Sequence, residues 1–323
     1  PPRSTPLYSS AASDVYKRES QELDNLSSLQ KQVLVERHLI SREQAARGEG
    51  SAAVVNRKQA LCLMINEEDH LRMQSIRPGL ALREAYDLVS SVDGQLEANL
   101  EFAFDHELGY LSSCPTNLGT GMRASAMLHL PGLVLSDQIA QVLQAVGKLQ
   151  LAVRGFFGEG TESLGNLFQV SNQSTLGESE ETIIRKLERV IEQVTSHERN
   201  ARQKLFEDDP DMVCDRVGRA YGTLRHAHVI ASKEALNLLS LLRFGAELGF
   251  FPPETGGICD SLLMEIQPAH LQLHSGNKLT PEQRDAIRAE IIRSRLQSLE
   301  PPAMVGKKDD GGWKCSSDTI ADS

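Results

Sequence analysis

The hydrophobic pattern of this 323-residue chain changes near residue 208, and this change limits the possible folds more than any other feature. Before it, short apolar runs typical of buried strands, such as residues 59–66 (QALCLMIN), are separated by stretches with helical spacing, such as residues 83–104. After it, all apolar patterns have helical spacing, and the expected helices are residues 213–224, 232–248, 259–266 and 281–299. The sequence therefore predicts an α+β domain followed by a helical C-terminal domain.

The predicted boundaries follow from this pattern. The first domain is expected to cover residues 23–207 and the second residues 208–300, with residues 1–22 disordered or truncated and residues 301–323 a disordered tail. Further helices are expected at residues 23–39, 136–149 and from Ser179 onward. Further strands are expected at residues 110–113, 151–154 and 167–170.

The composition argues against several classes of protein. The net charge of −10 is unfavourable for a general nucleic-acid binder. The chain has no run of eighteen apolar residues that would span a membrane, and its first residues lack the apolar core of a signal peptide. The five cysteines are widely spaced and include no CxxC pair, so we predict neither a disulfide framework nor a zinc site, and a cytoplasmic location.

The stretch from Cys114 to Ser125 (CPTNLGTGMRAS) is the strongest candidate for chemistry. Its two glycines allow backbone amides to approach an anion closely, and Arg123 would hold a negative group by charge-assisted hydrogen bonds. The same surroundings stabilise a thiolate. On these features alone, a purely structural turn is the more frequent explanation.

Two further motifs support the functional interpretation. Residues 66–72 read NEEDHLR and residues 153–160 read VRGFFGEG. Together with the cysteine stretch, and in this order, they resemble the ATP:guanido phosphotransferase family, which includes the arginine and creatine kinases. The resemblance runs from about Leu34 to Leu296 and is strongest to the McsB-type bacterial protein arginine kinases. It implies an antiparallel sheet flanked by helices in the first domain, which would be the catalytic domain.

The resemblance implies a division of labour around a guanidinium group. Glu68 and Glu159 would grip the guanidinium, align one nitrogen with the γ-phosphorus and remove its proton. Cys114 would place and polarise the same group without forming a covalent bond. For Glu68, the alternative is a solvated acidic cluster, because Glu67 and Asp69 adjoin it.

The resemblance also implies ATP and Mg²⁺, with arginines that neutralise the transferring phosphoryl group. No metal site made of protein ligands is predicted. The residues implied to contact the nucleotide are His38, Arg72, Arg123, Ala124, Ser125, Ala126, Met127, Arg154, Gly155, Phe156, Phe157, Gly158 and Glu159.

Two departures from the family pattern stand out. The family begins its catalytic sheet with a strand that reads roughly Ser-x-Arg-x-Arg, and nothing in residues 1–50 matches it. We therefore expect either a fragment or a chain that has lost part of the ATP site. Phe157 stands where arginine kinases tend to have arginine, and an aromatic residue there is in keeping with the McsB type.

The stretch Arg284-Asp285-Ala286-Ile287-Arg288-Ala289 matches the RDxxRA motif with which McsB-type kinases bind phosphoarginine. Arg284 and Arg288 are four residues apart, so they are expected on one face of a helix, where a phosphoryl group between them would relieve their repulsion. Asp285 and Ala289 would complete the site. The alternative is a solvated charged face. The resemblance favours arginine in proteins as the substrate.

The family precedent also implies partners: protein substrates with exposed arginine, possibly a heat-shock repressor, an activating zinc-finger adaptor and a Clp-type protease. It further implies a role in the stress response, allosteric activation and a possible homodimer. Two alternatives stay open. One is a catalytically impaired adaptor that binds phosphoarginine, and the other is a kinase of a small guanidino compound, which the helical C-terminal domain disfavours.

Overall fold

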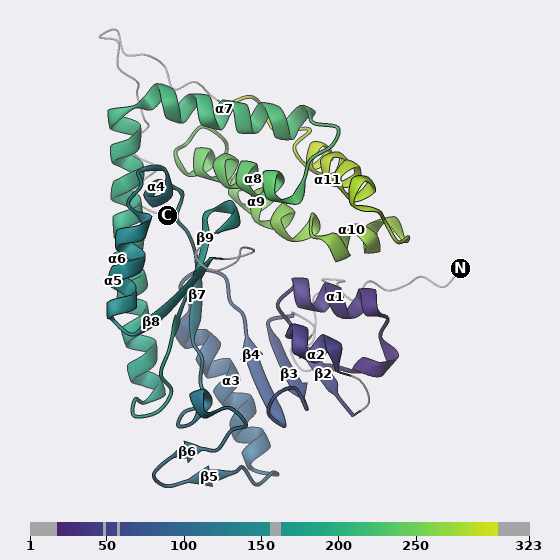
Figure 1. The fold of residues 1–323 in the computed structure, drawn as a ribbon, viewed down its shortest axis with the longest axis vertical. Helices are drawn as coiled ribbons and strands as arrows, with labels where there is room; N and C mark the ends of the chain where they lie inside the picture. Colours follow the sequence, from purple (N-terminus) through teal and green to yellow (C-terminus); the bar gives the residue numbers. More distant parts are fainter. Residues whose placement is uncertain (1–17, 48–49, 57–58, 156–162, 303–323) are drawn as a thin grey trace. The chain divides into compact units, whose positions relative to one another are not determined.

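The computed structural model describes residues 18–47, 50–56, 59–155 and 163–302 (Figure 1). The chain divides into two compact units. Unit 1 comprises Pro1–Ala124 and Asn172–Glu188, and unit 2 comprises Ser125–Ser171 and Arg189–Ser323. This division differs from the predicted boundary after residue 207, because the C-terminal helices share a unit with residues 125–171 of the predicted catalytic domain.

Unit 1 is built on a four-stranded antiparallel sheet of order β1-β2-β3-β4. Its strands are β1 (Arg18–Glu22), β2 (Ala52–Asn56), β3 (Leu61–Ile65) and β4 (Leu71–Ser75). In β3, Cys62 and Met64 are buried while the residues between them are partly exposed, as expected of a strand covered on one face. The prediction that residues 1–22 are disordered is wrong for Arg18–Glu22, which form β1 and pair along their whole length with β2.

The helices of unit 1 cover this sheet and lead to the cysteine stretch. They are α1 (Ser28–Glu36), α2 (Arg42–Ala46) and α3 (Leu82–Glu97), with the short turns η1 (Leu23–Asn25) and η2 (Pro115–Asn117). Residues from η1, α1 and the turn after α1 join the buried residues of β2 and β3 in one apolar cluster. The strand predicted at residues 110–113 is only the two-residue β6 (Gly109–Tyr110), paired with β5 (Phe104–Asp105).

Unit 2 contains a three-stranded sheet of order β7-β9-β8. The strands are β7 (Ser125–His129), β8 (Leu151–Gly155) and β9 (Leu167–Asn172), and β7 pairs antiparallel to β9. Two helices, α4 (Pro131–Leu135) and α5 (Ile139–Lys148), connect β7 to β8, and η3 (Leu164–Asn166) leads into β9. The long helix α6 (Glu180–Asp208) begins in unit 1 and ends in unit 2.

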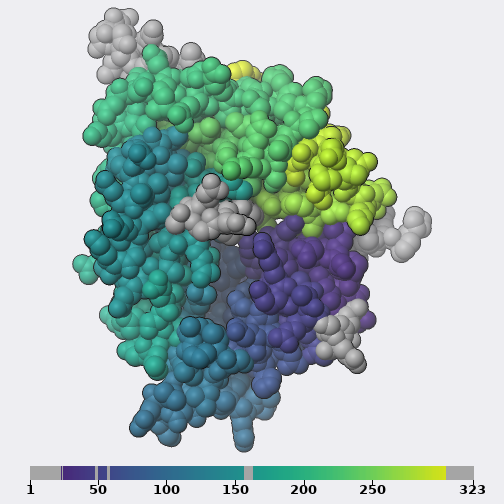
Figure 2. Space-filling model, viewed as in Figure 1, coloured from purple at the N-terminus to yellow at the C-terminus, as the bar shows by residue number. Residues whose placement is uncertain are grey.

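The C-terminal helices of unit 2, coloured green to yellow in Figure 2, enclose an extensive apolar core. They are α7 (Pro210–His226), α8 (Ser232–Glu247), α9 (Glu254–Glu265), α10 (Pro268–Ser275) and α11 (Pro281–Arg295). The predicted capping box at the start of α11 is present, since Thr280 and Gln283 bond to each other's main chain. The predicted α+β fold with a helical C-terminal region is confirmed. In the described part of the chain, no helix is both long and apolar enough to cross a membrane.

Candidate functional site

The loop between β3 and β4 places two neighbouring glutamates in opposite environments. Asn66 opens the loop with a left-handed φ of 55°, and its N–H donates to the carbonyl of His70 (2.9 Å). Within this tight turn Glu67 is buried, at 3% exposure, whereas Glu68 is exposed. The exposed position of Glu68 is compatible with both the predicted contact to a guanidinium and the alternative of a solvated acidic cluster, so its role stays a prediction.

The buried carboxylate of Glu67 holds the loop together. It accepts hydrogen bonds from the Ser41 hydroxyl, from the main-chain N–H of Glu68 (2.8 Å) and from Nη1 of Arg72 (2.9 Å). Ser41 is also the N-cap of α2, where it accepts from the N–H of Gln44 (2.9 Å). Burial by itself raises the pKa of Glu67, but these donors and the Arg72 charge outweigh it and leave the pKa below its ordinary value.

Ser113 joins the acidic loop to the cysteine stretch. Its main-chain N–H donates to Oδ1 of Asp69 (2.6 Å), and its hydroxyl donates to the carbonyl oxygen of Glu68 (3.1 Å). The next residue, Cys114, is half-buried, and its Sγ lies 3.0 Å from Oγ1 of Thr116. Two motifs that are about 45 residues apart in sequence are therefore adjacent in unit 1.

The glycine turn after Cys114 is held by close backbone contacts. Gly119 has a φ of +96°, and a Cβ there would lie 2.3 Å from the carbonyl oxygen of Thr175, so no larger residue fits. The Thr175 hydroxyl donates to the carbonyls of Thr116 (2.9 Å) and Leu118 (2.6 Å). At the end of the turn, the N–H of Ala124 donates to Oδ1 of Asn172 (2.8 Å).

The other predicted nucleotide contacts of unit 1 lie on or beside β4 or in the glycine turn. The Arg72 side chain is 47% exposed beyond its bond to Glu67, and Arg123 is exposed. His38 is exposed, with a φ of 56°, and its carbonyl accepts from Nε2 of Gln74 on β4 (2.5 Å). This bond places His38 beside β4, the strand that also carries Arg72.

Unit 2 carries the remaining predicted nucleotide contacts on two of its strands. Ser125, Ala126 and Met127 lie on β7, and Arg154 and Gly155 lie at the end of β8. Met127 is 45% exposed and Arg154 is exposed. The Ser125 hydroxyl accepts from Nε2 of Gln169 on β9 (3.0 Å). The predicted residues Phe156, Phe157, Gly158 and Glu159 lie outside the described residues.

The RDxxRA motif differs from its predicted geometry. Arg288 does not share an exposed face with Arg284, because its side chain is only 2% exposed. Its Nε donates to the carbonyl of Ile266 (3.2 Å), and its Nη1 donates to the carbonyl of Ile230 (2.9 Å) and to Asp285. The prediction of two surface arginines is therefore wrong for Arg288, because buried carbonyls that need donors surround it.

The remaining members of this motif lie on the first turns of α11. Ala289 is buried in the apolar core at 1% exposure. Arg284 is half-buried, and 29% of the Asp285 side chain is exposed. The Asp285 carbonyl accepts from the N–H of Ile230 (3.2 Å), which fixes the start of α11 against the segment before α8. Arg284 and Asp285 are thus the members that a ligand can reach.

Among the described residues, no group of three or more His, Cys, Asp or Glu side chains is placed to hold a metal ion.

Burial raises the pKa of Cys62 and of Cys259 to about 12 in each case, so both thiols stay protonated and act as core residues.

Comparison with known proteins assigns the family. The sequence pattern described as ATP:guanido phosphotransferase, C-terminal catalytic domain, matches residues 5–201. The chain belongs to the ATP:guanido phosphotransferase family. A second pattern, described as the protein-arginine kinase McsB C-terminal domain, matches residues 210–307. These matches confirm the resemblance that the three motifs and the RDxxRA stretch indicated.

Curated relatives similar to the chain are named protein-arginine kinase. The relative from Pelotomaculum thermopropionicum is 47% identical over 281 residues, which cover 87% of this chain and 79% of the relative. The relative from Moorella thermoacetica is 49% identical over 276 residues, covering 85% of this chain and 79% of the relative. The likeness therefore extends over the predicted catalytic domain and the helical domain together.

Two solved kinase structures share the fold. A lombricine kinase matches with a TM-score of 0.50 and 23% identity, covering 60% of this chain and 56% of that one. The duplicated taurocyamine kinase from Schistosoma mansoni, with bound transition state analog components, matches with a TM-score of 0.52 and 20% identity, covering 73% of this chain and 41% of that one. At these identities the likeness shows the fold alone.

Sequence reasoning missed two residues that shape this site, Glu67 and Ser113. Both were visible as polar residues next to predicted catalytic ones. The partners that give them a role, Ser41 for Glu67 and Glu68 for Ser113, lie 26 and 45 residues away. Only the Glu67–Arg72 pair, five residues apart, had a local signal in the sequence.

Proposed function

We propose that this chain is a protein-arginine kinase that transfers the γ-phosphoryl group of ATP to arginine side chains. One observation supports this most strongly: the exposed Glu68 is held by the buried Glu67 from one side and by Ser113, next to Cys114, from the other. A carboxylate and a thiol on adjoining, fixed loops are suited to a planar cation. The names of the curated relatives supply the substrate class.

In this proposal Glu68 receives one edge of the substrate guanidinium. A guanidinium carries its donors in a rigid fork, so two carboxylates, Glu68 and Glu159, fix its plane and direct one nitrogen towards the nucleotide. Because a protonated guanidinium is a poor nucleophile, Glu68 also accepts the proton of the attacking nitrogen. Cys114 lies beside this position and polarises the bound group. The Ser113 bonds keep the two loops in register.

Arginines would hold the nucleotide phosphates. Arg72 is anchored on one side by Glu67 and 47% exposed, so its position is set before any anion binds. Arg123 and Arg154 are exposed and would add further positive charge. Mg²⁺ would enter with ATP, because this ion is commonly bound through substrate phosphates and a few carboxylates. When bound, it would neutralise charge on the transferring phosphoryl group.

The helical domain would bind the product. We assign phosphoarginine recognition to Asp285, for the guanidinium half, and Arg284, for the phosphoryl half. Arg288 and Ala289 would act as the frame, because both are buried and Arg288 bonds to Asp285. Such a site would allow phosphoarginine to act as an allosteric activator. The proposed partners are arginine-bearing proteins such as a heat-shock repressor, a zinc-finger adaptor, a Clp-type protease and a second copy of the chain.

A second candidate function is a catalytically impaired adaptor that binds phosphoarginine. It is favoured by the absence of a Ser-x-Arg-x-Arg pattern from residues 1–50. Cytoplasmic location and a role in the stress response stay predictions under either function.

The test is to incubate the chain with Mg-ATP and an arginine-rich protein and to detect phosphoarginine by mass spectrometry under mild conditions. Free arginine serves as the control substrate. We expect the amount of phosphoarginine formed on the protein to be more than tenfold higher than the amount formed from free arginine. Transfer to free arginine alone would indicate a small-molecule guanidino kinase. No transfer to either, combined with binding of a phosphoarginine peptide, would indicate the adaptor.

A further inference from the structure

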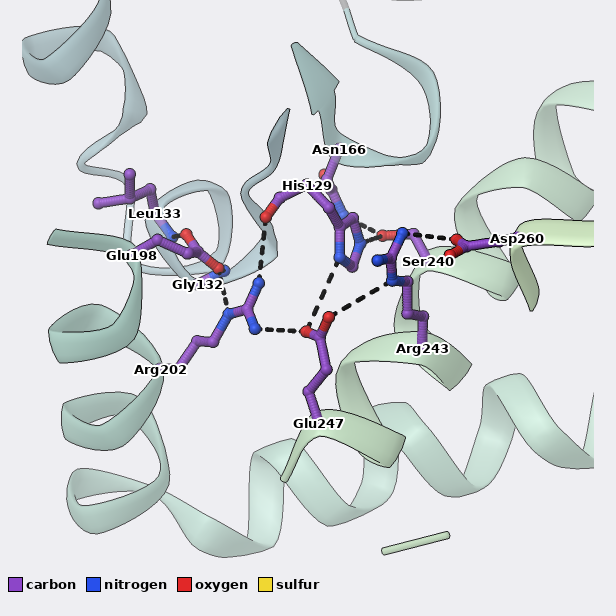
Figure 3. A network of polar contacts seen from close by, with 10 residues as sticks. All are labelled: His129, Gly132, Leu133, Asn166, Glu198, Arg202, Ser240, Arg243, Glu247 and Asp260. Carbon is purple, nitrogen blue, oxygen red and sulfur yellow. Dashed lines mark hydrogen bonds and ion pairs between the residues drawn. The ribbon is translucent and has the colours of Figure 1, made fainter. Parts of the chain in front are cut away.

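A polar network in unit 2 crosses the boundary between the two matched family patterns (Figure 3). At its centre, Ser240 of α8 contacts two residues of the catalytic pattern. Its Oγ lies 2.8 Å from Nε2 of His129, the last residue of β7, and accepts from Nδ2 of Asn166 in η3 (2.8 Å). One hydroxyl from the helical domain therefore contacts both the end of β7 and the turn that leads into β9.

Charged side chains from α6 and α8 hold the same strand end. Arg202 donates from Nη2 to the carbonyl of His129 (3.0 Å), from Nε to Glu198 (2.5 Å) and from Nη1 to Glu247. Glu198, at 2% exposure, accepts from the N–H groups of Gly132 and Leu133 (2.7 and 2.8 Å) at the start of α4. The end of β7 and the helix after it are thus fixed by side chains, as Figure 3 shows.

The outer part of the network is also ionic. Arg243 lies 3.4 Å from Glu247 and donates to Asp260 of α9 (2.6 Å). Oε2 of Glu247 lies 3.9 Å from Nδ1 of His129. These groups face His129 from α6, α8 and α9, with Arg202 and Arg243 opposing its protonation and Glu247 favouring it.

Burial determines the charge state of His129. Burial lowers the pKa of His129, and its side chain is only 6% exposed, so the imidazole is neutral near pH 7. Ser240 accepts from Asn166 and also bonds to Nε2 of His129, where its hydroxyl donates or accepts according to the tautomer of the ring. Without the Ser240 hydroxyl, two buried polar groups lose their partner.

We propose that Ser240 is a positioning residue for nucleotide binding, which acts by fixing β7 through His129. This inference rests on the proposed function, in which Ser125, Ala126 and Met127 of β7 contact the nucleotide. Met127 is two residues from His129, a distance of about 7 Å along an extended strand. A strand pinned at His129 and paired with β9 has little freedom to shift at Met127. The helical domain thus supports the nucleotide site as well as reading the product.

Ser240→Ala in the full chain tests this directly. The matched control is Ser261→Ala in α9, because the Ser261 hydroxyl is exposed and donates only to Gly257 of its own helix (3.0 Å). The measurements are the KM for ATP, kcat at saturating ATP, calorimetric affinity for Mg-ATP, and hydrogen–deuterium exchange of residues 125–129. Circular dichroism verifies that each variant folds. Alanine has a high helix propensity, so neither substitution should disturb its helix.

We expect Ser240→Ala to raise the KM for ATP and the dissociation constant by about threefold to tenfold. The kcat should change less than twofold, and exchange along β7 should be faster. Ser240→Thr, which keeps the hydroxyl, should return the KM to within twofold of the parent. A KM equal to that of the control, an effect on kcat alone, or no rescue by threonine would each overturn the inference. If the parent chain transfers no phosphoryl group, the proposed function is contradicted. The calorimetric affinity for Mg-ATP would still test the role of Ser240 in that case, because it does not depend on turnover.

Discussion

The acidic loop of unit 1 and the basic turn at the start of α11 in unit 2 each combine a buried charged residue with a more accessible residue of the same charge, and the sign of the charge is opposite in the two regions. In the loop, Glu67 is buried and bonded to Ser41, Arg72 and the main chain, while its neighbour Glu68 is exposed. In α11, Arg288 is buried and bonded to two carbonyls and Asp285, while Arg284 reaches the surface. Each motif contains one charge that holds the fold and one that is available to a ligand.

The difference between the two regions lies in what the buried charge holds. Glu67 accepts from side chains and one amide, so it fixes a loop and the direction of Arg72. Arg288 donates to carbonyls of residues 230 and 266, so it joins three segments of the helical core. Loss of Glu67 should therefore lower both the free energy of unfolding and the rate of phosphotransfer. Loss of Arg288 should lower mainly the free energy of unfolding.

The largest stability effect is expected for Arg288→Met. Methionine keeps the length of the side chain but leaves Asp285 and two buried carbonyls without their donor, which should lower the free energy of unfolding by about 3 kcal/mol. Urea denaturation followed by circular dichroism measures this value. A loss below 1 kcal/mol would mean that the Arg288 side chain is not a structural element and that both arginines face a ligand.

A smaller loss, about 2 kcal/mol, is expected for Glu67→Gln, because three donors lose a charged acceptor. The pKa of Glu67 is lowered in the folded state, so its contribution is present above the ordinary carboxyl pKa of 4.5 and is lost as pH falls through the folded value. The stability difference between parent and variant should therefore shrink between pH 6 and pH 3. A difference independent of pH would contradict this assignment.

The smallest stability effect is expected for Arg284→Ala, within about 0.5 kcal/mol of the parent, as for most surface substitutions. Its effect should appear in binding instead, as a loss of more than tenfold in affinity for a phosphoarginine peptide, measured by fluorescence anisotropy. Arg219→Ala is the control, because Arg219 is exposed and paired only with Asp215. Equal peptide binding by both variants would show that the motif is a charged surface.

Much of the fold is predictable from local patterns. The amphipathic spacing of α6, α7 and α8 and the capping box of α11 place these helices within a few residues, whereas α3 begins as predicted but ends at Glu97, before the predicted end at residue 104. Strands β2 and β4 escape prediction because they are only partly buried and β4 includes Arg72 and Gln74. The strand β1 (RESQE) has no apolar residue, so its place in the sheet comes from main-chain pairing with β2.

The site is predictable as motifs but not as environments. Glu67 and Glu68 are identical in type and adjacent, and they differ in their partners, because Ser41 and Arg72 both bond to the buried Glu67. The two arginines of α11 lie four residues apart, and distant carbonyls at Ile230 and Ile266 select Arg288 for burial. Sequence spacing defines a helix face, whereas burial depends on what packs against that face.

The most direct test of this account compares Glu68→Gln with Glu67→Gln, measuring phosphoarginine formation and unfolding free energy on the same samples. We predict that Glu68→Gln leaves the free energy of unfolding within about 0.5 kcal/mol of the parent, as expected of an exposed side chain, and reduces phosphoarginine formation more than tenfold. Glu67→Gln should lower both quantities. Retention of more than a tenth of the activity by Glu68→Gln, or a stability loss equal to that of Glu67→Gln, would contradict the assignment of Glu68 to the substrate guanidinium.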